Sequence, residues 1–518
     1  MRLLPVLVAG ILTGDALFGV VPPACWAALF CACLVPVVVL WIADSSPIAQ
    51  SLLLYACIAV SGAWIVSARK HGMVVSDDMG RSSFDAVVVS MPVTRDDGMC
   101  RCEIIVTSGR YAGRRIMAYM QGQGTLGDGG VECGVPRVGD GYEIRGGWLR
   151  PLVGPSGEKG DASAVRSYRR YLVSQGMAAQ MFISRSHMSR KVVTLRGLSS
   201  VQRMRIRMGR VRERLVGLFA SRGVSSDELS LVAAMTLGEK SLLTGELRES
   251  YVKAGASHIL ALSGMHLGVI SALLSFLLVT RRWRRLGMTV VLTAVWAYVM
   301  LVGMPVSVVR AAVMFSVMVF SVLQYRMDGN GVGSLMLTAF VMLVFNPLSL
   351  YDVGFQLSFV SVLGILLCYW RVRYRLMQLA GRKSGKLVAQ VVSLLSVCVV
   401  AQMAVAPLAA YHFGRFPGCF LLANIVAVPL SSAIICCALA LVVTSPLPFV
   451  ADVVAFVLVR MSHLMNCYIS WVSALPFADV RVDRFGWPHM LLVYVVYAIV
   501  YMLALYLRKM NDTFKGYR

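Results

Sequence analysis

Two histidines and a serine stand in a stretch of sequence that is otherwise largely apolar. The stretch runs from Gly255 to Gly268, and within it His258 and His266 lie eight residues apart with Ser263 between them. On one continuous helix this spacing places the two histidines within about 80° of each other. A histidine beside a serine is the arrangement of several hydrolases, so an intramembrane hydrolase is one interpretation. A polar stripe at membrane depth can instead line an aqueous path or hold helices together.

The sequence around Ser263 gives little support to catalysis. No acidic residue is close to it in the chain, and the chain has no Gly-x-Ser-x-Gly motif. There is also no Cys-x-x-Cys pair and no Cys/His spacing typical of zinc, so we expect no metal and no cofactor. We therefore favour a path-lining role for this stretch over a catalytic one.

The composition indicates a membrane protein. Of 518 residues, 58% are hydrophobic and only 15% are charged, and the mean hydropathy is +0.71. Apolar runs long enough to cross about 30 Å of hydrocarbon recur along most of the chain. We predict a polytopic α-helical membrane protein. Its formal net charge of +24 favours polyanions and anionic lipid as partners.

The apolar runs predict about three spans before residue 70 and about nine after residue 255. Two of the later spans, 305–325 and 333–346, are weak, and either could be re-entrant. The predicted spans are 3–20, 24–43, 49–67, 256–279, 287–304, 305–325, 333–346, 354–370, 387–410, 419–443, 453–475 and 488–507. The predicted domains are N-terminal helices over 1–70, a β domain over 71–184, a basic helical linker over 185–254, a membrane domain over 255–508 and a tail over 509–518.

The pattern between residues 71 and 184 differs from the rest of the chain. Short runs of alternating apolar residues are separated by Gly- and Asp-rich turns, which predicts a small antiparallel β domain, either a barrel or a sandwich. The predicted strands are 84–89, 102–107, 115–120 and 142–148. Cys102 or Cys100 is a candidate to pair with Cys133 in an oxidising compartment.

One segment of this domain combines cations with aromatic rings, which suits single-stranded nucleic acid. An ordinary solvated strand face explains the same residues equally well, because the domain carries 13 Lys/Arg against 12 Asp/Glu. The candidates are Arg110, Tyr111, Arg114, Arg115 and Tyr119.

The segment from Arg185 to Arg222 holds eleven Lys/Arg and one Glu. Apolar residues recur in it every three or four positions, so it predicts an amphipathic helix with a basic face. Such a helix can lie among anionic headgroups or bind phosphates, and we favour the interfacial interpretation. The phosphate-binding candidates are Arg203, Arg205, Arg207 and Arg210.

Loop charges predict the orientation. The loops 281–285 and 371–386 and the tail from residue 508 are basic, whereas 411–417 and 477–487 are not. The positive-inside rule then places the basic set and both termini in the cytoplasm, with the β domain outside.

Polar residues recur through the membrane half of the chain. Each alone is explained by a helix cap or by helix packing, but five clusters are too many for packing alone. An arginine at membrane depth suits an anionic permeant. The candidate path-lining residues are His258, Ser263, His266, Arg310, Asp352, Gln356, Gln402, Tyr411, His412, Arg415, Asn424, Arg460 and His463.

Five ordered blocks, most of them containing these polar clusters, resemble the ComEC family of bacterial DNA-uptake proteins. The blocks are Leu237-Gly238-Glu239, Ala254–Gly268, Gly303–Ala311, Tyr351–Ser358 and the pair Pro407–Gly414 with Ala423–Pro429. Earlier stretches, Val138–Asp140, Arg145–Trp148 and Ser167–Gly176, resemble the family's external OB-fold domain and the exit from it.

The resemblance implies an inner-membrane channel that passes single-stranded DNA into the cytoplasm during natural transformation. It also implies partners: an external DNA receptor and a cytoplasmic helicase or motor, since no Walker A motif occurs here. Longer members carry a metallo-β-lactamase-like domain, but this sequence ends at Arg518 without an His-x-His-x-Asp-His motif, so we expect no enzyme of that kind. A non-channel scaffold of the uptake machinery and a hydrolase using Ser263 remain the alternatives.

Overall fold

The computed structural model describes residues 3–43, 47–94, 99–121, 136–153, 163–195, 197–280, 282–323, 331–381, 385–482 and 485–516. The chain divides into two compact units. Unit 1 comprises Met1–Thr244, Leu260–Gln356 and Ser431–His463. Unit 2 comprises Gly245–Ile259, Leu357–Leu430 and Leu464–Arg518.

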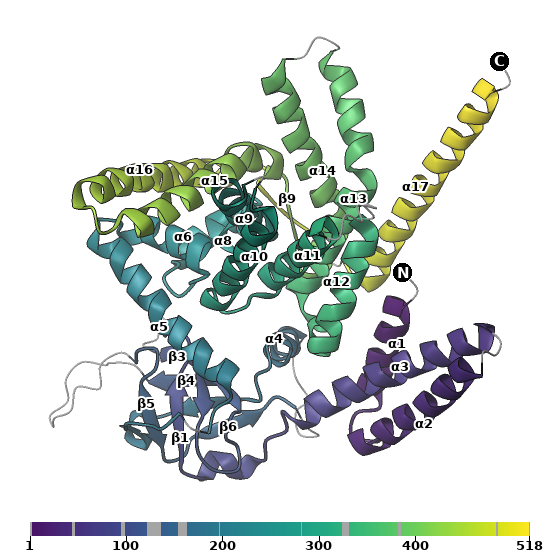
Figure 1. The fold of residues 1–518 in the computed structure, drawn as a ribbon. Helices are drawn as coiled ribbons and strands as arrows, with labels where there is room; N and C mark the ends of the chain where they lie inside the picture. Colours follow the sequence, from purple (N-terminus) through teal and green to yellow (C-terminus); the bar gives the residue numbers. More distant parts are fainter. Residues whose placement is uncertain are drawn as a thin grey trace. The chain divides into compact units, whose positions relative to one another are not determined.

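Three helices open unit 1, and two of them meet along small residues. The helices are α1 (Leu3–Ala16), α2 (Pro23–Ile42) and α3 (Pro47–His71). Both α1 and α2 pack on α3, as Figure 1 shows in purple. Gly10 lies against the backbone of Ala59, and Gly14 lies against Ala63. A side chain at either glycine would meet backbone, so the glycines permit the close approach that membrane helices favour.

The β domain contains one sheet in the described residues. Its strands are β1 (Phe84–Val88), β2 (Val93–Thr94), β3 (Met99–Val106), β4 (Arg115–Gln121), β5 (Gly141–Ile144), β6 (Trp148–Pro151), β7 (Ala179–Ile183) and β8 (Met188–Arg190), with η1 (Asp77–Arg81), α4 (Ser163–Ser174) and η3 (Arg185–His187) between them. The strand order is β6-β7-β4-β3-β1-β5-β8, with β2 beside β3.

The predicted class, a polytopic helical protein with an inserted small β domain, is confirmed. The prediction of a purely antiparallel sheet is wrong in one pairing, because β4 and β7 run parallel. The helix α4 lies between β6 and β7 in the chain, and it returns β7 beside β4 in the same direction. Longer connections of this kind are what parallel neighbours require.

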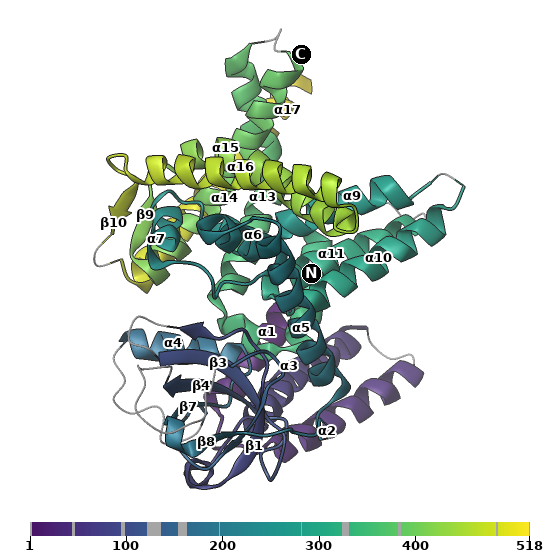
Figure 2. The same ribbon diagram turned by 90° about the vertical axis from the view of Figure 1, so that its left-hand side faces the viewer.

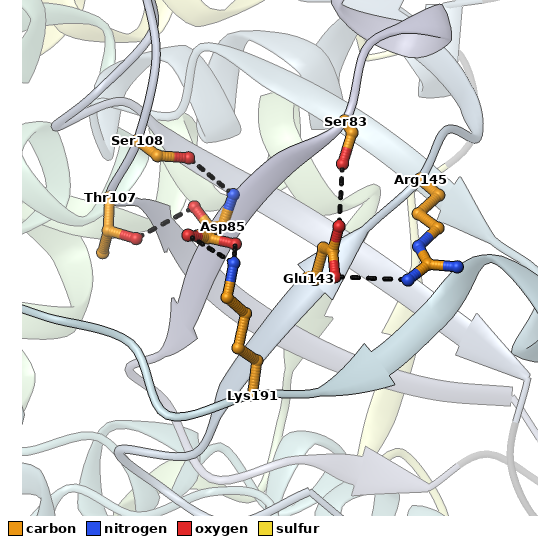
Figure 3. Close-up of polar contacts among 7 residues, drawn as sticks. All are labelled: Ser83, Asp85, Thr107, Ser108, Glu143, Arg145 and Lys191. Atoms are coloured by element: carbon orange, nitrogen blue, oxygen red, sulfur yellow. Dashed lines mark hydrogen bonds and ion pairs between the residues drawn. The ribbon is translucent and has the colours of Figure 1, made fainter.

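Polar side chains tie three neighbouring strands together at one side of the sheet (Figure 3). Lys191 follows β8, and its Nζ lies 3.0 Å from Oδ1 of Asp85 on β1. On β5, Glu143 accepts hydrogen bonds from Ser83 and from Arg145, each at 3.4 Å. The hydrogen bond from Arg145 is the largest cause that lowers the pKa of Glu143. These ties are solvated, so they fix register more than they stabilise the sheet.

A more deeply placed ion pair joins the middle strands. Arg115 Nε on β4 lies 2.5 Å from Glu103 Oε1 on β3, and the two side chains are only 18% and 12% exposed. Burial alone would raise the pKa of Glu103, but the charges of Arg115 and Arg205 and the hydrogen bond from Arg115 outweigh it, so the pKa is lowered. This carboxylate therefore stays ionised beneath two guanidinium groups.

Two helices lead from the sheet to the rest of unit 1. They are α5 (Ser200–Ser221) and α6 (Ser226–Leu237). A capping box starts α5, in which Ser199 and Gln202 exchange hydrogen bonds. The amphipathic helix predicted for residues 185–222 is therefore present only over α5, because residues 185–190 form η3 and β8, and β8 pairs with β5 in the sheet. In α6 all eight residues from Ser230 to Leu237 are buried, so α6 is an interior helix.

The remaining helices of unit 1 include several short ones. They are α9 (Gly264–Leu278), α10 (Arg284–Leu301), α11 (Val306–Leu323), α12 (Gly331–Phe345) and the 3-10 turn η4 (Pro347–Tyr351). Figure 2 shows α9, α10 and α11 side by side, and a shared apolar core joins them. Valines on one face of α10 (Val291, Val295 and Val299) form the centre of that core.

Unit 2 contains long helices and one small two-stranded sheet in the described residues. Its elements are α7 (Gly245–Lys253), α8 (Ser257–Leu260), α13 (Val353–Ala380), α14 (Lys386–Phe413), β9 (Arg415–Pro417), α15 (Phe420–Thr444), α16 (Pro448–Ser473), β10 (Asp479–Arg481) and α17 (Trp487–Gly516). The boundary between the units falls within α8, α13, α15 and α16. Gly364 of α13 approaches Ala404 of α14, and Tyr494 of α17 donates to the Ala404 carbonyl oxygen at 3.0 Å.

Eight described helices are long and apolar enough to cross a membrane. Four more are apolar but shorter: α1, α9, α11 in part and α12. The single span predicted over 256–279 is wrong, because that segment is divided into α8 and α9. At 15 residues, α9 and α12 are about 22 Å long, well short of a 30 Å hydrocarbon layer.

The Glu103 pair gives a testable prediction for the sheet. The pKa of Glu103 is below its ordinary value of 4.5, so the carboxylate stabilises the fold above pH 4.5, and that contribution is lost as pH falls through the lowered pKa. We expect Glu103→Gln to destabilise the sheet by about 3 kcal/mol at pH 7, because it leaves buried guanidinium groups without a negative partner. Hydrogen exchange of β3 and β4 in the full chain, corrected for intrinsic rates, measures this.

The difference between wild type and Glu103→Gln should shrink below pH 4.5. Glu143→Gln is the matched control, because it removes a carboxylate from a solvated pair on the same sheet. A Glu103→Gln variant with wild-type exchange at pH 7 would contradict the stabilising role of the pair.

Candidate nucleic-acid path

The polar stretch at residues 255–268 is a broken helix. α8 ends at Leu260, Ser263 has an extended backbone with φ −113° and ψ 166°, and α9 begins at Gly264. The hydroxyl of Ser307 on α11 donates to the Leu262 carbonyl oxygen at 2.5 Å. That bond satisfies a carbonyl that a continuous helix would use. His258 and His266 therefore lie on different helices and in different units, and the predicted common helical face is wrong.

His266 acts as part of a helix cap. Its side chain is fully buried, and its Nδ1 accepts a hydrogen bond from the Ser263 backbone N–H at 3.4 Å. This ring nitrogen therefore faces backbone at the first turn of α9 rather than the Ser263 hydroxyl. The geometry lacks the nucleophile–base contact that a hydrolase uses.

Arg310 lies beside the same turn. It belongs to α11, is 6% exposed, and its Nη2 stands 3.1 Å from the position that a Cβ on Gly264 would occupy. The methyl group of Ala311 is 3.4 Å from that position. Gly264 thus lets a guanidinium group rest on the start of α9, where His266 is also buried. Three predicted residues (Ser263, His266 and Arg310) are brought together here.

Asp352 joins the membrane half to the β domain within unit 1. Its Oδ1 accepts from the backbone N–H groups of Gly354 and Phe355, at 2.7 and 3.2 Å, which caps α13. Its Oδ2 accepts from Gln175 Nε2 at 2.7 Å, and Ser174 Oγ lies at 3.5 Å. Both partners lie at the end of α4. The predicted cap is therefore correct, and Asp352 is also a latch between α4 and α13.

The neighbouring candidate Gln356 is used locally. Its Nε2 donates to the Leu350 carbonyl oxygen at 2.9 Å. Asn346, at the end of α12, donates to the Ser174 carbonyl oxygen at 3.4 Å. These bonds hold α4 against η4, so the start of the motif Tyr351–Ser358 connects the β domain to the helices that follow η4.

The arginines of α5 form two stripes with different surroundings. Arg205 and Arg212, seven residues apart, point into unit 1. Arg205 contacts Glu103 at 3.8 Å and donates to the Gly303 carbonyl oxygen at 3.3 Å. Arg212 donates to the Leu301 carbonyl oxygen at 3.1 Å and lies 3.5 Å from Glu239.

The turn after α10 is built to receive Arg212. Gly303 has φ +85°, and a Cβ there would stand 2.8 Å from Arg212 Nη2. Leu301 is the last residue of α10, so its carbonyl is one that an arginine commonly satisfies at a helix C-terminus. Burial lowers the pKa of Arg205, and Glu103 opposes that change. Both guanidinium groups are committed to internal contacts.

The second α5 stripe faces outward. Arg203, Arg207, Arg210 and Arg214 follow a 4-3-4 spacing, and each is exposed. Arg210 donates to the Gly139 carbonyl oxygen at 3.2 Å, and Arg203 lies 3.4 Å from Ser200 Oγ. In the described chain Arg207 and Arg214 have no side-chain hydrogen bond or ion pair. Arg214 is an addition to the sequence-based candidates, and its spacing alone could have revealed it.

The β-domain candidates divide in the same way. Arg115 is held by Glu103 and donates to the Gln175 carbonyl oxygen at 2.5 Å. Tyr119 is 7% exposed and stacks on Phe182 with ring centroids 4.7 Å apart. Neither side chain is presented to a ligand. The other three candidates, Arg110, Tyr111 and Arg114, line a small cavity at the surface.

The candidate disulfide lies outside the described residues, because Cys133 is among those left undescribed. Its predicted partners Cys100 and Cys102 are buried in β3 at 3% and 1% exposure. Burial raises the pKa of both thiols. Their pairing with Cys133 stays a prediction.

In unit 2 the candidate Arg415 is a bracing residue. Its Nη1 lies 2.8 Å from Glu249 on α7 and 3.5 Å from Asp479 on β10. The hydrogen bond from Arg415 is the largest cause that lowers the pKa of Glu249. Nearby, buried Tyr251 donates to Asn466 Oδ1 at 2.9 Å. These bonds hold α7 against the β9–β10 sheet and α16.

The remaining candidates are spread over both units. In unit 2, His258, Tyr411 and His412 are exposed, Gln402 is half-buried and Asn424 is 6% exposed. In unit 1, exposed Arg460 lies over the Phe456 ring, and His463 lies 3.0 Å from Glu228. Among the described residues, these five residues of unit 2 do not form one hydrogen-bonded cluster.

A family comparison explains why these motifs occur together. The model of the family described as "Competence protein" matches residues 235–510, more than half of the chain. The chain belongs to the competence protein family. Its match begins within α6 and covers the segments that carry Arg310, Asp352 and Arg415. The sequence-based resemblance to the ComEC family is thereby confirmed.

One curated relative matches. ComE operon protein 3 of Bacillus subtilis (strain 168) is 28% identical over 255 residues, which are 47% of this chain and 29% of the relative. The chain therefore aligns with less than a third of that protein's length. No solved structure matches.

The Gly264 contact predicts a substitution effect. Gly264→Val should displace the Arg310 guanidinium group, since its Nη2 lies 3.1 Å from the new Cβ, and the γ-methyl groups should crowd Ala311; overpacking of this kind costs about 1–3 kcal/mol. We expect a lower melting temperature in detergent and faster hydrogen exchange over residues 262–268. Gly268→Val is the control, because no atom lies within 4 Å of its Cβ position. Equal effects of the two variants would contradict the contact.

The Asp352 latch predicts a rescue. Asp352→Asn replaces the charged acceptor of the Gln175 bond by a neutral amide, so the bond weakens and exchange should rise in α4 and at the start of α13. Adding Gln175→Glu restores a charged acceptor to the pair and should reverse the rise in α4. Hydrogen exchange of the three variants measures the coupling. A double variant that exchanges as fast as Asp352→Asn would show that the latch bond is unimportant.

Proposed function

We propose that this protein is a channel of the cytoplasmic membrane that passes single-stranded DNA into the cell during natural transformation. Membership of the competence protein family supports a part in DNA uptake. The similarity to ComE operon protein 3 supports the same assignment for the 255 residues that align. The direction of passage and the single-stranded substrate belong to the proposal.

The observation that carries it is the buried cluster of Arg310, His266 and Gly264 at the start of α9, a helix too short to cross the bilayer. A guanidinium group inside membrane helices is costly, and such residues mark ion and substrate pathways. Its charge suits phosphate, which arginine can bind through two parallel hydrogen bonds. Short helices are tolerated at membrane depth only where their ends face protein or a water-filled cavity.

The cluster is closed in this structure. Arg310 and His266 are 6% and 0% exposed, so a DNA strand can reach them only when α9 and α11 separate. We therefore assign the cluster the role of a gate. The bond from Ser307 to the Leu262 carbonyl oxygen holds the two helices together at this point.

The outward stripe of α5 is the proposed receiving surface. Arg203, Arg207 and Arg214 carry their charges on one exposed face of a helix that packs on α10. Such a receiving surface attracts the phosphates of a nucleic acid irrespective of its base sequence. Arg205 is left out of this surface, because its contacts are internal.

The orientation is part of the same proposal. Basic loops at 281–285 and 371–386 favour the cytoplasm, which leaves the β domain and α5 outside. In that arrangement the strand arrives at α5 from an external DNA receptor. A cytoplasmic helicase or motor then supplies the energy.

Two other functions fit the family less well. A scaffold without a pore would not need a buried arginine between short helices. A hydrolase using Ser263 would need a base at its hydroxyl, and His266 Nδ1 is instead bonded to the Ser263 backbone N–H.

Salt dependence of binding tests the receiving surface. We expect Arg203→Gln/Arg207→Gln/Arg214→Gln to weaken binding of a labelled dT oligonucleotide to the purified full chain. Three lost phosphate contacts should also flatten the slope of log K against log salt by about 2.

A control with the same charge change separates local contact from net charge. Arg137→Gln/Arg248→Gln/Arg284→Gln removes three exposed arginines elsewhere. It should leave the slope near the wild-type value. Equal slopes in the two triple variants would remove α5 from the DNA contact surface.

A further inference from the structure

A cavity of about 300 Å³ lies where α3 meets the turn between β3 and β4. Both segments belong to unit 1. The lining residues are His71, Val74, Ser76, Arg110, Tyr111 and Arg114. The volume is at the lower limit of small-ligand sites and suits a single headgroup or anion.

The cavity is lined by cations and hydroxyl groups, with no carboxylate among its lining residues. Tyr111 and Ser76 share a hydrogen bond between their hydroxyl groups across the cavity wall. The side chains of Arg110 and Arg114 make no hydrogen bond or ion pair with any described residue. The adjacent Arg115, by contrast, is held by Glu103 and a carbonyl oxygen. Two guanidinium groups are thus directed to a site without an internal anion.

The depth of the cavity is set by α3. This helix is one of the eight candidate spans, and its last residue, His71, lines the cavity. Its final turn is basic, with Arg69 and Lys70 beside His71. Basic residues at the end of a span sit at the level of the lipid headgroups. The cavity therefore opens where phosphates of the bilayer are abundant.

We propose that this cavity binds the phosphate of an anionic phospholipid headgroup. Arg110 and Arg114 pair with the phosphate oxygens, and the hydroxyl pair of Tyr111 and Ser76 adds one donor, because the other hydrogen is used in their mutual bond. The bound headgroup links the end of α3 to the β3–β4 turn. This site is independent of DNA passage, since it uses none of the residues assigned to the gate or to the receiving surface on α5.

The position of the cavity at the end of α3 favours lipid over nucleic acid as its ligand. A strand arriving from outside meets solvated surfaces first, whereas a headgroup is already beside the final turn of α3. Inorganic phosphate carries the same chemistry without an acyl anchor. The experiment therefore compares all three ligands.

The test uses the full chain, stripped of native lipid in neutral detergent. Binding of phosphatidylglycerol, phosphatidylcholine, inorganic phosphate and a dT oligonucleotide is measured for wild type, Arg110→Gln/Arg114→Gln and the control Arg137→Gln/Arg248→Gln. We expect wild type and control to prefer phosphatidylglycerol over phosphatidylcholine by at least five-fold. The cavity variant should lose that preference while keeping its melting temperature and its oligonucleotide affinity.

Three results would overturn the proposal. One is an unchanged phosphatidylglycerol preference in the cavity variant. Another is a loss of oligonucleotide binding in that variant with lipid binding intact, which would make the cavity a nucleic-acid site. The third is inorganic phosphate binding as tightly as phosphatidylglycerol, which would make it a free-phosphate site.

Discussion

The placement of α5 arginines against polar backbone is the interaction on which unit 1 depends. Arg205 reaches from the sheet's Glu103 to the Gly303 carbonyl oxygen, and Arg212 joins Glu239 to the end of α10. Both guanidinium groups are largely withdrawn from solvent, so each needs its partners. A single helix therefore fixes the β sheet, the end of α6 and the turn between α10 and α11. That turn leads directly into the helix that carries Arg310.

Several residues of the family motifs therefore connect elements of the fold, in addition to any part they play in the DNA path. Glu239 and Gly303 meet through Arg212, Asp352 holds α4, and Arg415 holds α7 in unit 2. The cluster of Gly264, His266 and Arg310 combines burial and a cationic side chain with the start of the short helix α9. The proposed gate is thus a small part of a larger set of polar contacts, and opening it would break the Ser307 bond and part the apolar core that α9 shares with α11.

The sequence predicted the secondary-structure elements better than the contacts that individual side chains make. Alternation over 84–89, 102–107 and 115–120 predicted three strands of the sheet, because strand faces are encoded locally. The broken helix at 261–263 was missed, since the hydroxyl that takes the Leu262 carbonyl belongs to Ser307, 45 residues away. Arg205 and Arg207 look identical in sequence, yet one is internal and the other exposed. The seven-residue spacing from Arg205 to Arg212 places these two arginines on one face of the helix, and it is the local feature that sets them apart from Arg207.

The most direct test of the gate locks it. The Cβ of Ala311 lies 3.4 Å from the Cβ position of Gly264, close to the 3.5–4.5 Å of a disulfide, so Gly264→Cys/Ala311→Cys should cross-link α9 to α11. Passage of a labelled single strand into liposomes is measured for this variant and for wild type, oxidised and then reduced. We predict that oxidation stops passage in the variant alone and that reduction restores it. Equal passage by the cross-linked and reduced variant would contradict a gate between α9 and α11.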